Sequence, residues 1–179
     1  METLQATADT DALTARISAL IDAGRPAAAR PLLTAVRRRV PPSPYLAELA
    51  ARLALHEGRA DLALRELNEA VAQNPDHAGL RKCRVDVGML LGDIEGAAKD
   101  AAEAVILDRG DPAAKALLGV LMLELKRPAD AVACLREAVS ANPNNPMYCQ
   151  GLAAAQEANG VGQSLVIRDP FVFGDFDHQ

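Results

Sequence analysis

The sequence predicts an all-α protein built from antiparallel pairs of helices, on three observations. Half of its 179 residues are hydrophobic, yet only 3% are aromatic, and alanine is the most frequent residue. Ala, Leu, Glu and Arg favour helices, whereas the aromatic and β-branched residues that favour strands are sparse. Finally, glycine, alanine and proline recur with a fixed spacing of 34 residues. A period of this length is typical of stacked helical repeats.

The repeat consists of five columns that stay in phase along the chain without an insertion. A column contains residues that are 34 positions apart, and each column keeps a residue type in most of its slots. The columns are Gly24, Gly58, Gly92, Lys126 and Gly160; Ala29, Ala63, Ala97 and Ala131; Pro41, Pro75, Arg109 and Pro143; Val36, Ala70, Ala104 and Ala138; and Leu33, Leu67, Ala101 and Leu135.

Each column has a physical reason within a helix pair. Glycine accepts positive φ, so it ends one helix before the next begins. Alanine lets two helices approach closely, and leucine fills the space between them. Proline cannot continue a helix and disfavours helical geometry in the residue before it. Apolar residues between these positions recur at helical spacing. The predicted helices are 11–23, 26–39, 44–57, 60–73, 78–91, 94–107, 112–125, 128–141 and a last helix, 146–159.

The pattern resembles the tetratricopeptide repeat family over about residues 10–160. The family asks for Ala at the twentieth position of each repeat, which the alanine column from Ala29 to Ala131 supplies. The family's aromatic sites are vacated: the eleventh position, often Tyr, holds Leu20, Ala54, Gly88 and Met122. The resemblance implies a right-handed α-solenoid of antiparallel helix pairs. Its expected parts are an N-terminal extension 1–9, repeats 10–43, 44–77, 78–111 and 112–145, a terminal helix 146–159, and a non-helical tail 161–179.

In proteins of this family, the first helix of each pair lines a concave groove. The resemblance therefore implies a groove with an apolar floor and charged flanks, which suits an extended or helical peptide. Several of these residues could instead pack between repeats, and the charged ones could simply form a solvated face. The implied groove residues are Ile21, Tyr45, Glu48, Leu49, Arg52, Leu55, Lys82, Cys83, Asp86, Met89, Leu117 and Val120.

Some members of this family grip the acidic carboxyl tails of heat-shock chaperones with a clamp of Lys and Asn side chains. The matching slots here hold Thr14 and Ser18, then Leu49, then Gly79 and Cys83. None of these residues supplies the cation or amide that the clamp needs, so the sequence argues against that function.

Charge and cysteine content exclude several classes. The net charge of -5 and the pI of about 5.2 argue against nucleic-acid binding, which relies on concentrated Lys and Arg. No apolar run approaches the ~18 residues of a membrane span, and no signal peptide is recognisable. Cys83, Cys134 and Cys149 form no disulfide framework, so we expect reduced thiols and a cytoplasmic protein. We expect no metal, no cofactor and no catalytic constellation.

The segment 161–179 departs from the repeat and contains all three phenylalanines of the chain. Leu165 to Ile167 and Phe171 to Phe173 suggest extended backbone. We expect Phe171, Phe173 and Phe176 to be anchors. Three interpretations stay open: the segment docks on its own repeats, docks on a second copy and drives homo-oligomerisation, or leads to a linear motif or a further domain.

The sequence thus favours a non-enzymatic scaffold or adaptor that binds a peptide segment of a partner protein in its groove. Two alternatives remain. Small acidic chaperones of bacterial secretion systems are similar in size, charge and repeat number. A regulatory repeat domain of a larger enzyme would have the same composition. No feature of the sequence identifies the partner.

Overall fold

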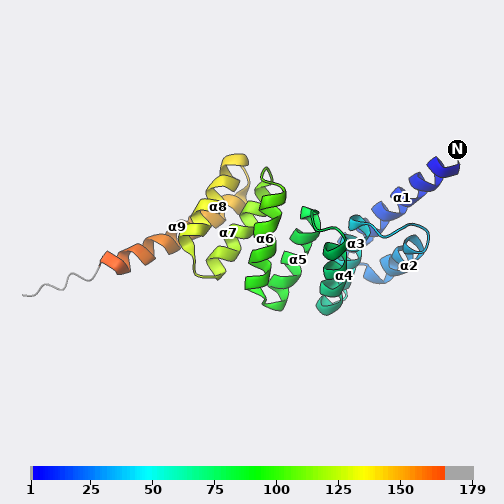
Figure 1. The fold of residues 1–179 in the computed structure, drawn as a ribbon, viewed down its shortest axis with the longest axis horizontal. Coiled ribbons are helices and arrows are strands. Elements are labelled where there is room, and N and C mark those ends of the chain that lie inside the picture. Colours follow the sequence, from blue (N-terminus) through cyan, green and yellow to red (C-terminus); the bar gives the residue numbers. More distant parts are fainter. Residues whose placement is uncertain (1, 168–179) are drawn as a thin grey trace, which may run out of the picture. The chain divides into compact units, whose positions relative to one another are not determined.

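The computed structural model describes residues 2–167, and side chains from residue 10 to 160. Within this part, every regular element is an α-helix, and the two helices of each pair run antiparallel (Figure 1). The helices are α1 (Glu2–Asp22), α2 (Pro26–Arg37), α3 (Pro44–His56), α4 (Ala60–Gln73), α5 (Ala78–Leu91), α6 (Ile94–Leu107), α7 (Pro112–Glu124), α8 (Pro128–Ala141) and α9 (Pro146–Ile167).

The predicted all-α class is confirmed, and the internal helix ends agree within two residues. Two ends differ. Helix α1 begins at Glu2, ahead of the predicted residue 11. Helix α9 runs on to Ile167, so the prediction of a non-helical segment from residue 161 is wrong for 161–167. Gly160 and Gly162 each cost a helix only about 1 kcal/mol relative to alanine, which an established helix tolerates. Residues 168–179, including the predicted anchors Phe171, Phe173 and Phe176, lie outside the described residues.

The chain divides into two compact units, residues 1–114 and 115–179, and each is treated separately. In the first unit, each helix packs against the next one in the chain. Helix α3 also packs against both α1 and α5. Among the described residues, α2, α4 and α6 form no comparable layer. The unit therefore curves with α1, α3 and α5 on its inner side, and we call their solvent-exposed side the inner face.

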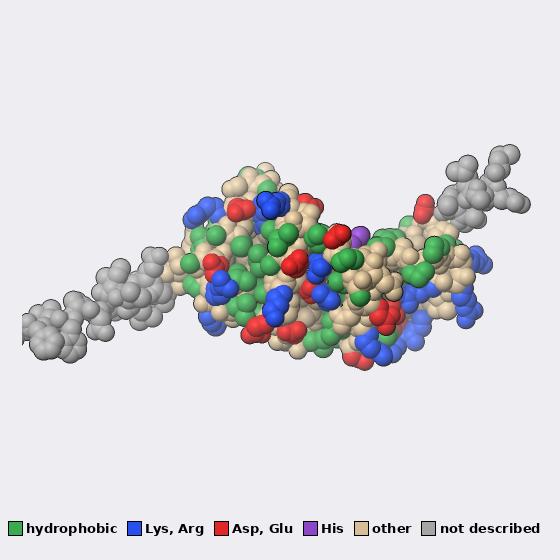
Figure 2. All heavy atoms as spheres, viewed as in Figure 1, with side chains coloured by type: hydrophobic (Ala, Val, Ile, Leu, Met, Phe, Trp, Pro, Cys, Tyr) green, Lys and Arg blue, Asp and Glu red, His purple; other side chains and the backbone are tan. Residues whose placement is uncertain are grey.

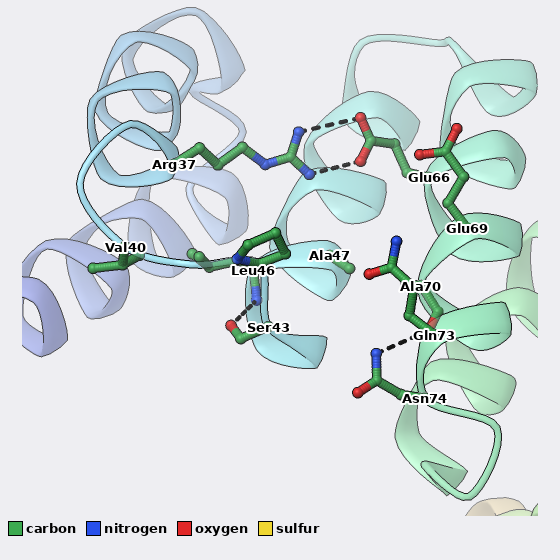
Figure 3. Close-up of a pocket in the computed structure, with 11 residues that line it drawn as sticks. Arg37, Val40, Ser43, Leu46, Ala47, Glu66, Glu69, Ala70, Gln73 and Asn74 are labelled. Carbon is green, nitrogen blue, oxygen red and sulfur yellow. Dashed lines mark hydrogen bonds and ion pairs between the residues drawn. The ribbon is translucent and has the colours of Figure 1, made fainter.

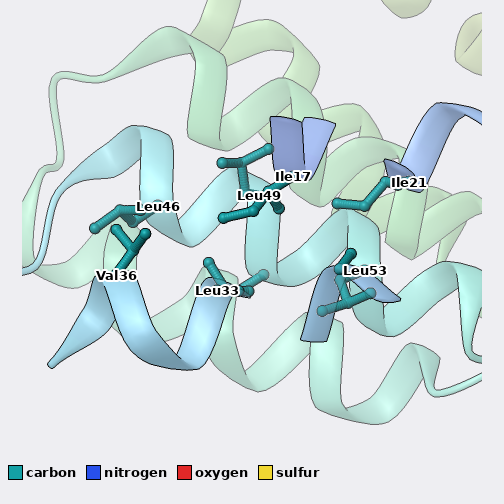
Figure 4. Close-up of a cluster of buried hydrophobic side chains, with 9 residues drawn as sticks. Ile17, Ile21, Leu33, Val36, Leu46, Leu49 and Leu53 are labelled. Atoms are coloured by element: carbon teal, nitrogen blue, oxygen red, sulfur yellow. The ribbon is translucent and has the colours of Figure 1, made fainter. Parts of the chain in front are cut away.

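The core of the first unit begins with aliphatic side chains from α1, α2 and α3 (Figure 4). These side chains are almost completely buried, and each contributes about 1.5–3 kcal/mol relative to an exposed one. They are Ile17, Ile21, Leu33, Val36, Leu46, Leu49 and Leu53. The next cluster, between α3, α4 and α5, is dominated by smaller residues: Ala51, Ala54, Ala63, Leu67, Ala70, Val71, Leu80 and Val87. Small side chains there permit a closer approach of the helices.

Glycine allows the closest helix contacts in both units. A Cβ added to Gly88 of α5 would lie 3.2 Å from the Cβ of Ala97 in α6. In the second unit, a Cβ added to Gly119 of α7 would lie 2.6 Å from the Cγ of Leu135 in α8. These glycines occupy interior helix positions, where their flexibility is a disadvantage. Their contribution is therefore space for the neighbouring helix.

A polar side chain precedes most first helices of a pair and caps them. Ser43 accepts a hydrogen bond from the amide of Leu46, and His77 accepts one from the amide of Leu80. In the same slot, Asp111 accepts from the amide of Ala113. Each bond satisfies an amide at the helix start that has no partner within the helix. In the second unit, Asn145 accepts from the amide of Met147. These caps are 34 residues apart and form a further column of the repeat.

The turn within each helix pair requires a left-handed backbone. Gly24, Gly58 and Gly92 have φ values of 66°, 72° and 79°. Lys126 occupies the same slot with φ of 59°, and it is the only non-glycine residue with positive φ in the described part of the chain. A side chain in this conformation costs roughly 1–2 kcal/mol. The lysine slot is therefore strained, whereas the glycine slots are not.

We predict that Lys126→Gly stabilises the protein by about 1 kcal/mol, because the strain at this slot exceeds the entropic cost of glycine in the unfolded chain. The reverse change at the equivalent slot, Gly92→Lys, should destabilise it by a similar amount. Urea unfolding followed by the helical circular dichroism signal measures both. Shifts of the same sign in the two variants would contradict this explanation.

Candidate functional site

Two of the predicted groove residues do not reach the surface. Ile21 and Leu49 are 0% exposed and belong to the core between α1, α2 and α3. Their assignment to a peptide-binding surface is therefore wrong. Both carry the long aliphatic side chains that fill the junction of three helices, and the repeat position alone does not distinguish a groove floor from a core. Their role is to hold α1 and α3 together (Figure 4).

The other predicted residues of the first unit reach solvent to different degrees. Tyr45 is 48% exposed at the start of α3, and Asp86 is exposed on α5. A further side chain, Leu90 at the end of α5, is 66% exposed. The half-buried residues are Glu48, Arg52, Leu55, Lys82, Cys83 and Met89. Leu117 and Val120 are half-buried on α7, in the second unit.

Arg52 links α3 to α1. One guanidinium nitrogen donates to Oγ of Ser18 at 3.2 Å, and another pairs with the carboxylate of Asp22. Ser18 in turn donates to the second oxygen of Asp22 at 3.4 Å. The guanidinium is thus occupied by the protein itself. The sequence analysis singled out Arg52 but missed Asp22, whose signal is its place near the end of α1, one turn after Ser18.

Lys82 is paired in the same way. Its Nζ donates to Oδ2 of Asp111 at 2.6 Å, and this hydrogen bond raises the pKa of Lys82. Burial alone would raise the pKa of the Asp111 carboxyl. The bond from Lys82 and the backbone amides of Ala113 and Ala114 outweigh burial and lower that pKa. Asp111 therefore acts both as a cap of α7 and as the counter-ion of Lys82.

The neighbours of Lys82 in its basic run point to a different element. Arg84 donates through Nε to Asp100 of α6 at 2.6 Å, and Arg81 lies 3.6 Å from the same carboxylate. Asp100 is only 8% exposed. The two arginines of this run are thus paired with a carboxylate of α6 and link α5 to α6. The run does not form a continuous basic surface.

Glu48 lies over the first turn of α5. A Cβ added to Gly79 would come within 2.6 Å of Oε1 of Glu48, so the glycine leaves space for this carboxylate. The nearest titratable nitrogen is Nδ1 of His77, at 3.8 Å. That same nitrogen accepts the capping hydrogen bond from the amide of Leu80. An accepting nitrogen carries no proton, so Nδ1 of His77 offers Glu48 no hydrogen bond in this arrangement.

The pKa of the Cys83 thiol depends on its burial and on the charges of these side chains. This pKa is raised from the ordinary 9.0 to about 11, mainly by burial and then by the negative charges of Glu48 and Asp86. Arg52 and Lys82 act in the opposite direction, with smaller effects. Desolvation also raises the pKa of Asp86, although its side chain remains exposed. The inner face therefore has a negative potential at Cys83.

The clearest hollow of the first unit lies away from the inner face (Figure 3). Its volume is about 360 Å³, and it lies between the end of α2, the start of α3, and α4. The bidentate pair of Arg37 with Glu66 crosses its rim, with distances of 2.6 and 3.2 Å. The remaining lining is mixed, with apolar residues such as Val40 and Leu46 and polar ones such as Glu69 and Gln73. This hollow results from the separation of α2 and α4 on the outer side.

Charges are interspersed over the surface shown in Figure 2, and basic side chains gather around α2. Arg37, Arg38 and Arg39 at the end of this helix are exposed. No helix of the described residues is both long and apolar enough to cross a membrane. Within the same residues, no group of three or more His, Cys, Asp or Glu side chains is arranged to hold a metal ion.

The structure is that of a helical repeat protein. Its helix pairs recur every 34 residues, small residues lie at the helix contacts, and alternate helices of the first unit form an inner layer. The tetratricopeptide repeat family model matches residues 20–82 and 89–155, and the chain belongs to this family. A comparison with curated proteins finds no match.

Solved structures with this fold share little sequence with the chain. The first tetratricopeptide domain of Spaghetti (RPAP3), bound to the HSP90 peptide SRMEEVD, is 19% identical, with a TM-score of 0.62 over 64% of this chain and 91% of that one. A repeat protein from Parabacteroides merdae is 19% identical, with a TM-score of 0.69 over 89% and 68%. The second such domain of human RPAP3, in complex with the HSP70 peptide SGPTIEEVD, is 19% identical, with a TM-score of 0.58 over 64% and 98%.

We predict that Cys83 reacts slowly with iodoacetamide in the folded protein. Raising the pKa from 9.0 to about 11 lowers the thiolate fraction at about pH 8 roughly 100-fold. The greater nucleophilicity of a more basic thiolate recovers about tenfold, so the net rate should be about tenfold below that of the unfolded chain. A variant with Cys134→Ser and Cys149→Ser isolates the reaction. Equal rates in buffer and in urea would show that the inner face does not suppress the thiolate.

We also predict that the stabilisation from the Lys82–Asp111 pair is greatest near neutral pH. The lowered pKa of Asp111 means that its contribution is lost as the pH falls through the folded-state value, below about 4. The raised pKa of Lys82 means that its contribution is lost above about 10.5, as the pH rises through the folded-state value. Lys82→Met should cost about 1 kcal/mol at neutral pH, because the pair is partly exposed.

Urea unfolding of Lys82→Met at about pH 3, 7 and 11 measures this dependence. Lys99→Met is the matched control, since Lys99 is exposed on α6 and has no ion-pair partner among the described residues. A cost that is the same at all three pH values would contradict the electrostatic assignment.

Proposed function

We propose that the protein is an interaction module that binds a peptide segment of a partner protein on the inner face of its first unit. The proposal assigns it no catalytic step and places it in the cytoplasm, in keeping with its free thiols Cys83, Cys134 and Cys149. The groove residues retained in this proposal are Tyr45, Glu48, Arg52, Leu55, Lys82, Cys83, Asp86 and Met89, with Leu90 added. The parts that Leu117, Val120 and the phenylalanines of the tail would have in binding stay predictions.

The observation that carries this proposal is the combination of exposed apolar and charged side chains on adjacent helices. Tyr45 and Leu90 are 48% and 66% exposed, at opposite ends of α3 and α5. Covering a large apolar side chain contributes about 1.5–3 kcal/mol. Half-buried Leu55 and Met89 add apolar surface at the carboxyl ends of α3 and α5. A peptide laid across α3 and α5 would cover this surface while its ends remained in solvent.

The family relation supports a binding role without specifying the ligand. Two of the similar structures hold short peptides from HSP90 and HSP70. The residues of the present chain differ at the slots that would grip such acidic tails. Leu49 is buried in the core, and Cys83 has its pKa raised by burial and by two neighbouring carboxylates. We therefore transfer the mode of binding, a peptide on the inner layer of helices, and not the identity of the ligand.

We predict that peptides selected from a random displayed library will bind the protein through Tyr45 and Leu90. The double variant Tyr45→Ala/Leu90→Ala should weaken the affinity of a selected peptide about tenfold or more, because two apolar anchors are lost. Isothermal titration calorimetry measures the affinity. Ile106→Ala/Met147→Ala is the control, since these side chains are 60% and 77% exposed on other surfaces. Equal losses in both variants, or none, would contradict the proposed site.

A further inference from the structure

The cations of the inner face already have partners. Arg52 is held by Ser18 and Asp22, and Lys82 is held by Asp111 at 2.6 Å. An acidic ligand would have to compete with a protein carboxylate for either cation. Such a competition gains little, because one ion pair is exchanged for another of similar geometry. The two cations are therefore poor anchors for an acidic peptide.

The carboxylates that remain have no cation of their own. Glu48 faces only His77, whose Nδ1 is 3.8 Å away and accepts a backbone hydrogen bond. Asp86 is exposed and lies outside ion-pair distance of the described Lys, Arg and His side chains, although the charge of Lys82, one turn earlier on α5, acts to lower its pKa. The two side chains come from adjacent helices, α3 and α5. Because Arg52 and Lys82 are already paired with Asp22 and Asp111, these two carboxylates give this part of the inner face an excess of negative charge.

The position of Cys83 links these carboxylates in space. Cys83 lies one helical turn after Gly79, which Glu48 approaches, and one turn before Asp86, so both carboxylates lie near its thiol, and both add to the rise of its pKa by burial. Gly79 gives Glu48 its place over the start of α5, as the 2.6 Å approach of an added Cβ shows. Half-buried Met89 and exposed Leu90 follow Asp86 along the same helix. Negative charge and apolar surface are thus adjacent on this face.

We propose that the inner face selects a basic segment of a partner protein, in which a Lys or Arg residue lies beside an apolar residue. Glu48 and Asp86 receive the cation, and Met89 and Leu90 receive the apolar side chain. This inference rests on the proposed function and names the class of its ligand. The charge of this proposed ligand is opposite to the net negative charge of SRMEEVD and SGPTIEEVD, the peptides bound in the similar structures. Charge complementarity of this kind controls specificity and association rate.

The test is the charge of the peptides that the wild-type protein selects from an unbiased displayed library. We expect the enriched sequences to contain Lys or Arg next to apolar residues. A synthetic peptide of this type should bind at least tenfold more tightly than its counterpart with Glu in place of each basic residue. Added salt should weaken the basic peptide, because exposed ion pairs are screened.

The variant Glu48→Gln/Asp86→Asn locates the charge effect. It should bind the basic peptide about tenfold more weakly and reduce its preference over the Glu-containing counterpart. Glu95→Gln/Glu103→Gln removes the same number of charges from exposed positions on α6 and should leave the affinity within about twofold. Circular dichroism checks that both variants keep the helical fold.

The outcomes separate the two proposals. Enriched acidic or uncharged peptides that still depend on Tyr45 and Leu90 would overturn the basic ligand and leave the proposed function standing. Basic peptides that are indifferent to Glu48 and Asp86 would overturn the assignment of these carboxylates. No enrichment, or binding that ignores Tyr45 and Leu90, would overturn the proposed function together with the inference.

Discussion

The close approach of neighbouring helices is the constraint on which the rest of the structure depends. Alanine and glycine at the contacts bring α5 against α6, and α7 against α8, to distances at which an added Cβ would be crowded or would clash. Dense contact between short helices replaces the aromatic side chains that members of this family often place there. Alternate helices α1, α3 and α5 can then touch one another and form the inner layer of the first unit. The exposed side of that layer is the surface proposed to bind a partner.

Electrostatics on this layer follow from the same packing. When two first helices lie side by side, a side chain from one reaches the next, as Arg52 reaches Ser18 and Asp22. A cation in this position stabilises the array and is no longer available to a ligand. A charged side chain remains available to a ligand where its neighbour in the next helix does not carry the opposite charge. Glu48 is the example: its neighbour His77 is occupied by a backbone amide.

The period and the breakers were sufficient to predict the helices, because each column has a purpose within a single helix pair. The same reasoning failed for Ile21 and Leu49. Their repeat positions were expected to face the groove, but these side chains lie in the core where α1, α2 and α3 meet. This reasoning also missed the capping column of Ser43, His77, Asp111 and Asn145, whose members share a hydrogen-bonding role but not a residue type. Helix α9 is longer than predicted because the repeat pattern ends at residue 160, whereas the helix continues to Ile167. Ion pairs such as Lys82 with Asp111 depend on how far each side chain extends and in which direction. The spacing of residues in the sequence does not reveal this.

The capping column has a consequence for how such a protein can change over evolutionary time. Glu48 approaches the cap of α5, and Lys82 bonds the cap of α7; both pairs join the fifth position of a repeat to its last. A residue of the proposed binding face is thus close to the residue that starts the next helix. If the proposed face binds a partner, recognition and folding share one pair of side chains at this point, and a new specificity there requires a paired exchange. Positions such as Leu90, which touch no cap, are free to vary singly.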